Sequence, residues 1–327
     1  MDCQLSVILC TYNPNRELLA KALAAVAAQS LARDRFELIV IDNNSSPALQ
    51  EDDLAALSGG PVRLVRELRQ GLTFARACGL KTASSERICF VDDDNEIAPD
   101  FFETALAIFW AEPRLGVFGG VAEGALGRSV GPLKTAFLPH LGVRDMGADD
   151  MTGSGAAWGP WEPIGAGLCL RAEVGEGYVA YVEGEGAAGG LGRQGGALLS
   201  GEDSLISRIA HCQGFLCGYR PKLRLRHHIG AGRLTYGYMA RILHGHGRSH
   251  VLLERIVGES PPPVGSLAAI LRTAFNFFHR LRKEGPRTAI GMVFWDRGYF
   301  AEVRRPIGAP VDRPLAEILA TAAPKRY

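Results

Sequence analysis

The chain has 327 residues, of which 47% are hydrophobic, enough to bury the core of one large domain or of a domain with an appendage. Seven cysteines show no CxxC pair, the first residues lack a signal-peptide pattern, and no run of 18 apolar residues occurs. These features exclude a disulfide scaffold and predict a cytoplasmic protein, at most peripheral to the inner face of a membrane. The net charge of +1 excludes neither nucleic acid nor membrane, since residues 220–297 carry fourteen Lys and Arg against four Asp and Glu.

The first 125 residues alternate between two hydrophobic periods. Short, nearly continuous apolar runs predict strands that are covered on both faces, at 5–10, 36–42, 62–67 and 87–92. Segments with apolar residues on one helical face predict helices between or after them, at 16–29, 71–83 and 99–110. Strands that alternate with helices predict an α/β layer built on a parallel sheet.

The pattern weakens after residue 120. Strands are expected at 163–170 and 220–229, and a helix is expected at 201–214. The glycine-rich segment 182–196 has too few apolar side chains for a core and predicts a loop. The residues after 229 predict helices, interrupted by a linker at 260–265.

Polar residues follow three of the predicted strands. They are Thr11, Tyr12 and Asn13 after the first strand, Asp42 to Ser45 after the second, and Asp92, Asp93 and Asp94 after the fourth. Ligands of parallel sheets bind outside the carboxyl ends of the strands, so these residues predict one binding crevice.

The three adjacent aspartates suggest a metal site. In an extended segment Asp92 and Asp94 share one face while Asp93 points elsewhere. Two hard oxygen ligands at a strand end suit Mn²⁺ or Mg²⁺, which would also remove their mutual repulsion. An acidic turn that caps the following helix is the alternative.

Six segments resemble the GT-A glycosyltransferases of family 2, which invert the configuration at the anomeric carbon of the sugar they transfer. They are SVILCTYNP, ELIVIDNNS, GLTFARACGL, RICFVDDDNEIAPDFF, GAGLCLR and GEDSLISRI, in the family's order and approximate spacing. The resemblance covers about residues 4–230. It implies a GT-A catalytic domain over 1–232, with a Rossmann-like nucleotide-binding half (1–122), an acceptor half (123–232) and a basic helical region at 233–327.

The resemblance also implies roles for individual residues. Thr11 and Tyr12 would line the nucleotide pocket, Asp42 would accept from the base, and Arg76 would contact the diphosphate, although Ala77 follows it where the family often has Asn. The same predicted substrate-binding set includes Asn13, Asn44, Asp92, Asp93 and Gly167. Asp94, Asp92 and His228 would hold the metal, and His227 would face the other side of its strand. Asp42 favours UDP or dTDP sugars, while related sequences also accept GDP sugars.

The implied reaction is a single displacement at the anomeric carbon, with a hydroxyl of a saccharide, a lipid-linked molecule or another acceptor as nucleophile. A divalent cation would neutralise the departing diphosphate, and one carboxylate would take the proton of the hydroxyl. Asp203 would be that base, with Glu202 beside it. A carboxylate that only caps the helix start is the alternative for Asp203. The resemblance places such an enzyme in polysaccharide, glycolipid or glycoconjugate assembly.

Three further features have two interpretations each. Trp158 and Trp161 are either stacking platforms for an acceptor or packing anchors. His244, His246 and His250 have a spacing similar to metal ligands, but a solvated or phosphate-facing role is the alternative. Residues 264–283 predict a basic amphipathic helix that lies on an anionic membrane, on its own domain or on a twin subunit.

Two other functions compete with the glycosyltransferase. A sugar-phosphate nucleotidyltransferase would carry a glycine-rich, basic segment after the first strand, where this chain has TYNPNREL. A non-catalytic nucleotide-sugar-binding partner would not need the GED sequence at 201–203. No nucleic-acid partner is expected.

Overall fold

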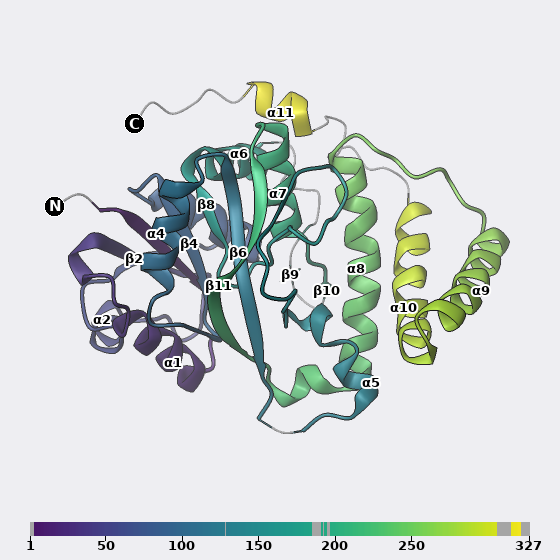
Figure 1. Ribbon diagram of the computed structural model, residues 1–327, viewed down its shortest axis with the longest axis horizontal. Coiled ribbons are helices and arrows are strands. Elements are labelled where there is room, and N and C mark those ends of the chain that lie inside the picture. The colour runs from purple at the N-terminus through teal and green to yellow at the C-terminus, as the bar shows by residue number, and fades with distance from the viewer. Residues whose placement is uncertain are drawn as a thin grey trace.

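A computed structural model describes residues 3–127, 129–184, 191, 193–194, 197–305 and 315–321. Its centre is a nine-stranded sheet with the order β3-β2-β1-β4-β8-β6-β11-β5, and β7 pairs with β11 (Figure 1). The sheet is parallel from β3 to β4 and mixed beyond, because β8 runs antiparallel to both β4 and β6. The predicted α/β fold, with a parallel sheet in its first half, is therefore confirmed.

The N-terminal half follows the predicted alternation closely. Its elements are β1 (Leu5–Thr11), α1 (Arg16–Ala27), β2 (Phe36–Asp42), α2 (Glu51–Ser58), β3 (Arg63–Arg66), α3 (Leu72–Thr82), β4 (Arg87–Asp92), β5 (Asn95–Ile97) and α4 (Phe101–Ala111). Every residue of β1 is buried, as expected for a central strand covered on both faces.

The second half returns to the same sheet. Its elements are β6 (Leu115–Ala125), α5 (Pro132–Thr135), β7 (Met151–Gly153), β8 (Cys169–Arg171), α6 (Ala172–Glu183), β9 (Arg193–Gln194), β10 (Ala197–Leu198), α7 (Glu202–Cys212) and β11 (Leu216–His228). β8 is shorter than the strand predicted at 163–170, because the chain turns at Gly167, whose φ is +66°. The predicted glycine-rich loop lies largely outside the described residues.

Two hydrophobic layers enclose the sheet. One joins the sheet to α1 and α4 and includes Leu23, Phe102 and Phe109. The other joins it to α3, α6 and α7 and includes Tyr178 and Ile206. Burial of each such side chain contributes about 1.5–3 kcal/mol, so the sheet is a rigid support for the residues at its carboxyl edge.

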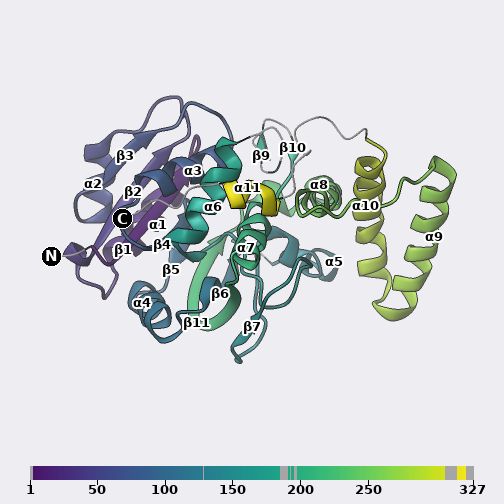
Figure 2. The ribbon, with the colours of Figure 1, turned by 90° about the horizontal axis from the view of Figure 1, so that it is seen from above.

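Three long helices form the C-terminal part, α8 (Tyr236–Ile256), α9 (Ser266–Lys283) and α10 (Pro286–Val303), and a short helix, α11 (Leu315–Thr321), follows. They stand in a row, with α8 against the sheet domain, α10 next, and α9 at the outer end (Figures 1 and 2). Glycines let α8 and α10 approach closely: a Cβ on Gly298 would lie 2.0 Å from the carbonyl oxygen of His244, and one on Gly247 would lie 2.1 Å from that of Trp295.

Within the described residues, the apolar face predicted for 264–283 is exposed and does not pack on the rest of the chain. Among the described residues, α9 instead contacts α10 through an adjacent stripe that includes the buried Ala269 and Arg280, whose guanidinium pairs with Asp296 at 2.7 and 3.1 Å. No helix in the described residues is long and apolar enough to cross a membrane. All seven cysteines are free thiols.

Candidate functional site

A cavity of about 760 Å³ opens at the carboxyl edge of the parallel strands. It is lined by residues that follow β1, β2 and β4, as predicted from the three polar strand ends. Residues that the chain supplies much later also line it, from the start of α7, the end of β11, and helices α8 and α10. The last two helices come from the region expected to be separate, so the boundary predicted at 232 does not separate that region from the cavity.

The three aspartates all line this cavity. The expected alternation stops at Asp92 because Asp93 and Asp94 form the turn between β4 and β5. The Thr11 hydroxyl donates a hydrogen bond to Asp93. Burial raises the pKa of Asp93 to about 6, the Thr11 hydrogen bond opposes this rise, and the neighbouring carboxylates of Asp94 and Asp92 add to it.

Two cationic groups surround Asp94. Its Oδ2 lies 3.2 Å from Nη1 of Arg233 and 3.5 Å from Nε2 of His227. Burial lowers the pKa of His227, but the Asp94 carboxylate outweighs burial, so the pKa lies above its usual value. The acidic turn is thus partly neutralised by the protein itself.

The structure places His227 at the cavity, whereas the sequence had pointed to His228. His228 pairs with Glu96 and does not line the cavity. The signal was present in the sequence: Leu223, Leu225 and His227 alternate onto the buried face of β11. Arg233 was also missed, although it is a basic residue just after the end of that strand.

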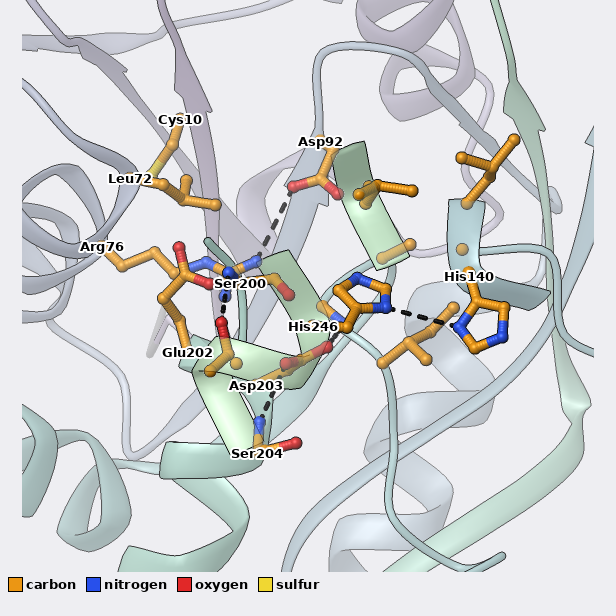
Figure 3. Close-up of a pocket in the computed structure, with 18 of the residues that line it drawn as sticks. Cys10, Leu72, Arg76, Asp92, His140, Ser200, Glu202, Asp203, Ser204 and His246 are labelled. Atoms are coloured by element: carbon orange, nitrogen blue, oxygen red, sulfur yellow. Dashed lines mark hydrogen bonds and ion pairs between the residues drawn. The ribbon is translucent and has the colours of Figure 1, made fainter. Parts of the chain in front are cut away.

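Arg76 connects the acidic turn to the start of α7. Its guanidinium is buried and lies 4.0 Å from the Asp92 carboxylate (Figure 3). It also lies over the Phe90 ring, 5.1 Å from the ring centroid. Burial lowers the pKa of Arg76, but the carboxylates of Asp92, Glu202 and Asp203 outweigh burial and raise it. Arg76 therefore remains a permanent cation in the cavity wall.

The carboxylate of Asp203 is held by backbone groups at the first turn of α7. Its Oδ2 accepts from Gly165 N–H at 3.0 Å, and its Oδ1 accepts from Ser204 N–H at 2.9 Å. A glycine suits position 165 because a Cβ there would lie 2.5 Å from Nη2 of Arg76. Asp203 and its buried neighbour Glu202 both line the cavity, as predicted.

A buried ion pair missed in the sequence supports this helix start. Glu162 accepts from Arg208 at 2.6 Å and from the hydroxyl of Ser204. Both side chains of the ion pair are almost fully buried, so loss of one partner would leave an uncompensated charge. The pair fixes the orientation of α7 and with it the position of Asp203.

Three predicted substrate-binding residues instead shape the loops beneath the cavity and do not line it. The Asp42 carboxylate accepts from Ser45 N–H at 2.8 Å and from Leu49 N–H at 3.2 Å. Asn13 and Asn44 adopt positive φ values of 45° and 65°, which Asn tolerates better than most residues. Asn13 ties the first loop to the second, because its Oδ1 accepts from Ser46 N–H at 2.8 Å.

Thr11 and Tyr12 line the cavity, as predicted, together with Asn43 of the second polar strand end and with Gly71, which was not singled out. The side chain of Asn43 donates to the carbonyls of Glu67 and Arg69 and accepts from Gly71 N–H at 2.8 Å. It thereby sets the entry of α3, the helix that carries Arg76.

The two tryptophans separate into the two predicted roles. Trp158 is 58% exposed and lines the cavity, where it can stack on a ligand. Trp161 packs against the core and covers Gly153 and Gly159, so it is a packing anchor. Gly167 likewise serves packing: a Cβ there would lie 2.6 Å from Leu225, and its neighbours Gly165 and Ala166 line the cavity instead.

Helices α8 and α10 form the wall of the cavity beyond Asp203. His246, His250 and Trp295 line it, and Nδ1 of His246 lies 3.3 Å from Nδ1 of His140 (Figure 3). Burial lowers the pKa of His140. His244 lies away from this wall, beside α9, so the three histidines do not form one metal site.

The donor set around the acidic turn suits a hard divalent cation that shares its ligands with a substrate. Within the described residues no group of three or more His, Cys, Asp or Glu side chains is arranged as a complete metal site. Asp92 and Asp94 nevertheless present carboxylate oxygens to the cavity. A cation held by these two would complete its coordination with water or phosphate oxygens, as is usual for Mg²⁺ and Mn²⁺.

The parallel sheet of the first half, the acidic turn at its edge and the mixed second half are those of a GT-A type fold. Residues 6–148 match the family described as glycosyl transferase family 2. This part of the chain, a little under half of its length, thus matches the family that the six sequence segments had indicated.

A search of curated proteins finds no match. Among solved structures, S. aureus TarS is similar at 16% identity over 88% of this chain and 54% of that chain, with a TM-score of 0.46. TarS 1–349 in complex with UDP is similar at 16% identity over 90% of this chain and 91% of that chain, with a TM-score of 0.48. This chain spans about half of the length of the longer TarS chain.

Proposed function

We propose that this protein is a metal-dependent, inverting glycosyltransferase that moves a sugar from UDP or dTDP to a hydroxyl acceptor. One observation carries the proposal: a single cavity brings the acidic turn after β4 together with Asp203 at the start of α7. The first group suits the donor's diphosphate and its cation, and the second suits proton removal from an acceptor. The family match to residues 6–148 supports the same reaction class.

The donor would lie across the ends of β1, β2 and β4. Tyr12, Asn43 and Gly71 line that side of the cavity and would face the nucleoside. Mn²⁺ or Mg²⁺ held by Asp92 and Asp94 would, when bound, neutralise the charge that develops on the departing diphosphate. Arg233 and His227 pair with Asp94 in this structure. A cation bound at Asp94 would replace them there, and they could then turn towards phosphate oxygens.

The acceptor hydroxyl would lie next to Asp203. Two backbone N–H groups fix its carboxylate, so it enters the reaction already oriented and loses little entropy there. One positioned base is sufficient, because the diphosphate leaves without being protonated. Such a base typically contributes about 10²–10⁴-fold to the rate.

The remaining part of the cavity, with Trp158, His246 and Trp295, would hold the acceptor. Aromatic and imidazole groups suit the apolar face and the hydroxyls of a saccharide. We place the enzyme in the cytoplasm, in polysaccharide, glycolipid or glycoconjugate assembly. The outer C-terminal helices remain available for a membrane or a second subunit.

Nucleotide binding tests the donor and metal assignments. The melting temperature is measured with UDP, dTDP and GDP, each with Mn²⁺ or with EDTA. UDP or dTDP with Mn²⁺ should stabilise the protein by about 2.7 kcal/mol at a hundredfold excess over Kd. Asp94→Asn should remove the Mn²⁺-dependent part, while Asp149→Asn, an exposed loop change, should not. Stabilisation that is identical in EDTA would contradict the metal assignment.

Release of UDP from UDP sugars tests the base. Asp203→Asn should lower the rate about 10²–10⁴-fold while UDP with Mn²⁺ still raises the melting temperature as in the wild type. An unchanged rate would exclude Asp203 as the base. Loss of nucleotide binding together with the rate would assign Asp203 to the donor pocket instead.

A further inference from the structure

The outer face of α9 is a continuous apolar surface without a partner in the described part of the chain. We call it the α9 strip, made of Leu267, Ile270, Leu271, Ala274, Phe275, Phe278 and Leu281. Leu267 and Phe275 are 70% exposed, and Leu271 and Phe278 are 61% exposed. Scattered exposed apolar side chains are ordinary, but this many on one helical face indicate an interaction site.

The helix behind the strip is firmly anchored, so its exposure is not a sign of loose packing. On the opposite side Ala269 is buried, and Arg280 forms its ion pair with the buried Asp296 of α10. In both views of the molecule α9 is the outermost helix, with α10 between it and α8 (Figures 1 and 2). The strip therefore faces away from the catalytic domain.

The charges around the strip are nearly all positive. Arg272, Arg282, Lys283, Arg287 and Arg297 are exposed on α9 and α10. Of the acidic residues between 266 and 305, Asp296 and Glu302 are buried and paired with arginines, which leaves Glu284 as the exposed one. An apolar strip with a basic border has the chemistry that an anionic lipid surface complements.

We propose that the α9 strip docks the protein on an anionic lipid bilayer. A second copy is the other obvious occupant, but a two-fold pairing of this face would bring two basic borders together. A bilayer with anionic headgroups accepts the apolar residues and neutralises the cations at the same time. Binding would be peripheral, in keeping with the finding on membrane-spanning helices above.

A groove beside the strip adds to the apolar area. It has a volume of about 710 Å³ and lies between α9 and α10, where Ala274, Phe277 and Val293 line it and Arg297 stands at its side. Lipid tails can enter such an apolar groove while a headgroup meets the arginine. The opposite side of α10 presents Trp295 to the catalytic cavity. Docking would hold that cavity roughly two helix layers, about 20 Å, above the lipid.

Vesicle sedimentation with the full chain tests the proposal. Vesicles of phosphatidylcholine alone are compared with vesicles that also contain phosphatidylglycerol, at low and high salt. We expect binding to the anionic vesicles that weakens at least about tenfold as salt screens the basic border. Equal binding to both kinds of vesicle, or none by a protein that sediments as a monomer, would overturn the proposal.

Paired variants locate the surface. Leu271→Glu with Phe275→Glu should reduce vesicle binding at least about tenfold, since both positions lose apolar contact and gain repulsion from anionic lipid. The control variant Leu57→Glu, at a partly exposed leucine of α2, should leave vesicle binding unchanged. Sedimentation velocity that shows a dimer which the double variant dissociates, without vesicle binding, would instead assign the strip to a second copy.

The docking surface is independent of the transfer reaction. The double variant should still be stabilised by UDP with Mn²⁺ as much as the wild type, which also shows that it is folded. Failure of the vesicle experiment with normal nucleotide binding would refute the membrane proposal alone. Failure of nucleotide binding in the wild type would refute the proposed function and leave the vesicle result standing.

Discussion

Asp93 allows the energetic cost of the acidic turn to be measured. Its pKa of about 6, against an ordinary value of 3.8, means that the folded protein binds this proton more tightly than the unfolded chain does. At about 1.36 kcal/mol for each pKa unit, the difference is worth roughly 3 kcal/mol. This stability is present below pH 3.8 and is lost as the pH rises to about 6.

Asp93→Asn removes this charge but keeps an oxygen that can accept from Thr11. Relative to the wild type, the variant should gain up to about 3 kcal/mol of unfolding free energy between pH 4 and pH 7, most of it by pH 6. Urea denaturation in EDTA, followed by circular dichroism at each pH, measures the gain. Asp149→Asn serves as the exposed control. If the unfolding free energies of Asp93→Asn and the wild type differ by the same amount at every pH from 4 to 7, the burial argument for Asp93 is wrong.

Three further changes test other parts of the structure. Gly298→Ala should destabilise the protein by at least about 2 kcal/mol in urea, because its Cβ would meet a backbone carbonyl of α8 at 2.0 Å, whereas Gly237→Ala, which has open space, should not. Asp296→Ala should cost about 3 kcal/mol by the same measurement, because it leaves the partly buried Arg280 without its ion pair. Arg233→Met should weaken UDP binding in calorimetry about tenfold or more, since a charge-assisted hydrogen bond is worth about 1.5–3 kcal/mol. Unchanged affinity would remove Arg233 from the donor site.

The sequence predicted best what depends on neighbours along the chain. The strands β1, β2 and β4 and the polar residues at their ends were located to within a residue or two, because continuous apolar runs and an abrupt polar ending are local signals. The start of α7 at Glu202 was also found from its acidic first turn. The acidic turn and the start of α7, which line the same cavity, can therefore both be identified from the sequence.

Properties that depend on tertiary contacts were not predicted. Asp93 lines the cavity because a two-residue turn replaces the expected extended chain, and Asp42 is engaged by the backbone of its own loop. The ion pair of Glu162 with Arg208 joins residues that are 46 positions apart, so no local sequence pattern predicts it. Likewise, nothing in the spacing of His246 and His250 indicates that α8 packs over the start of α7 and closes the cavity.

The cavity is built from two stretches of the chain. The family match ends at residue 148, yet Asp203, His246 and Trp295 come from later segments. On the proposed function, the first stretch lines the donor side of the cavity and the later helices line the acceptor side. Under the proposed function, exchange of helices α8 to α10 with those of a related enzyme should change the acceptor while leaving Arg233, His227 and the acidic turn in place.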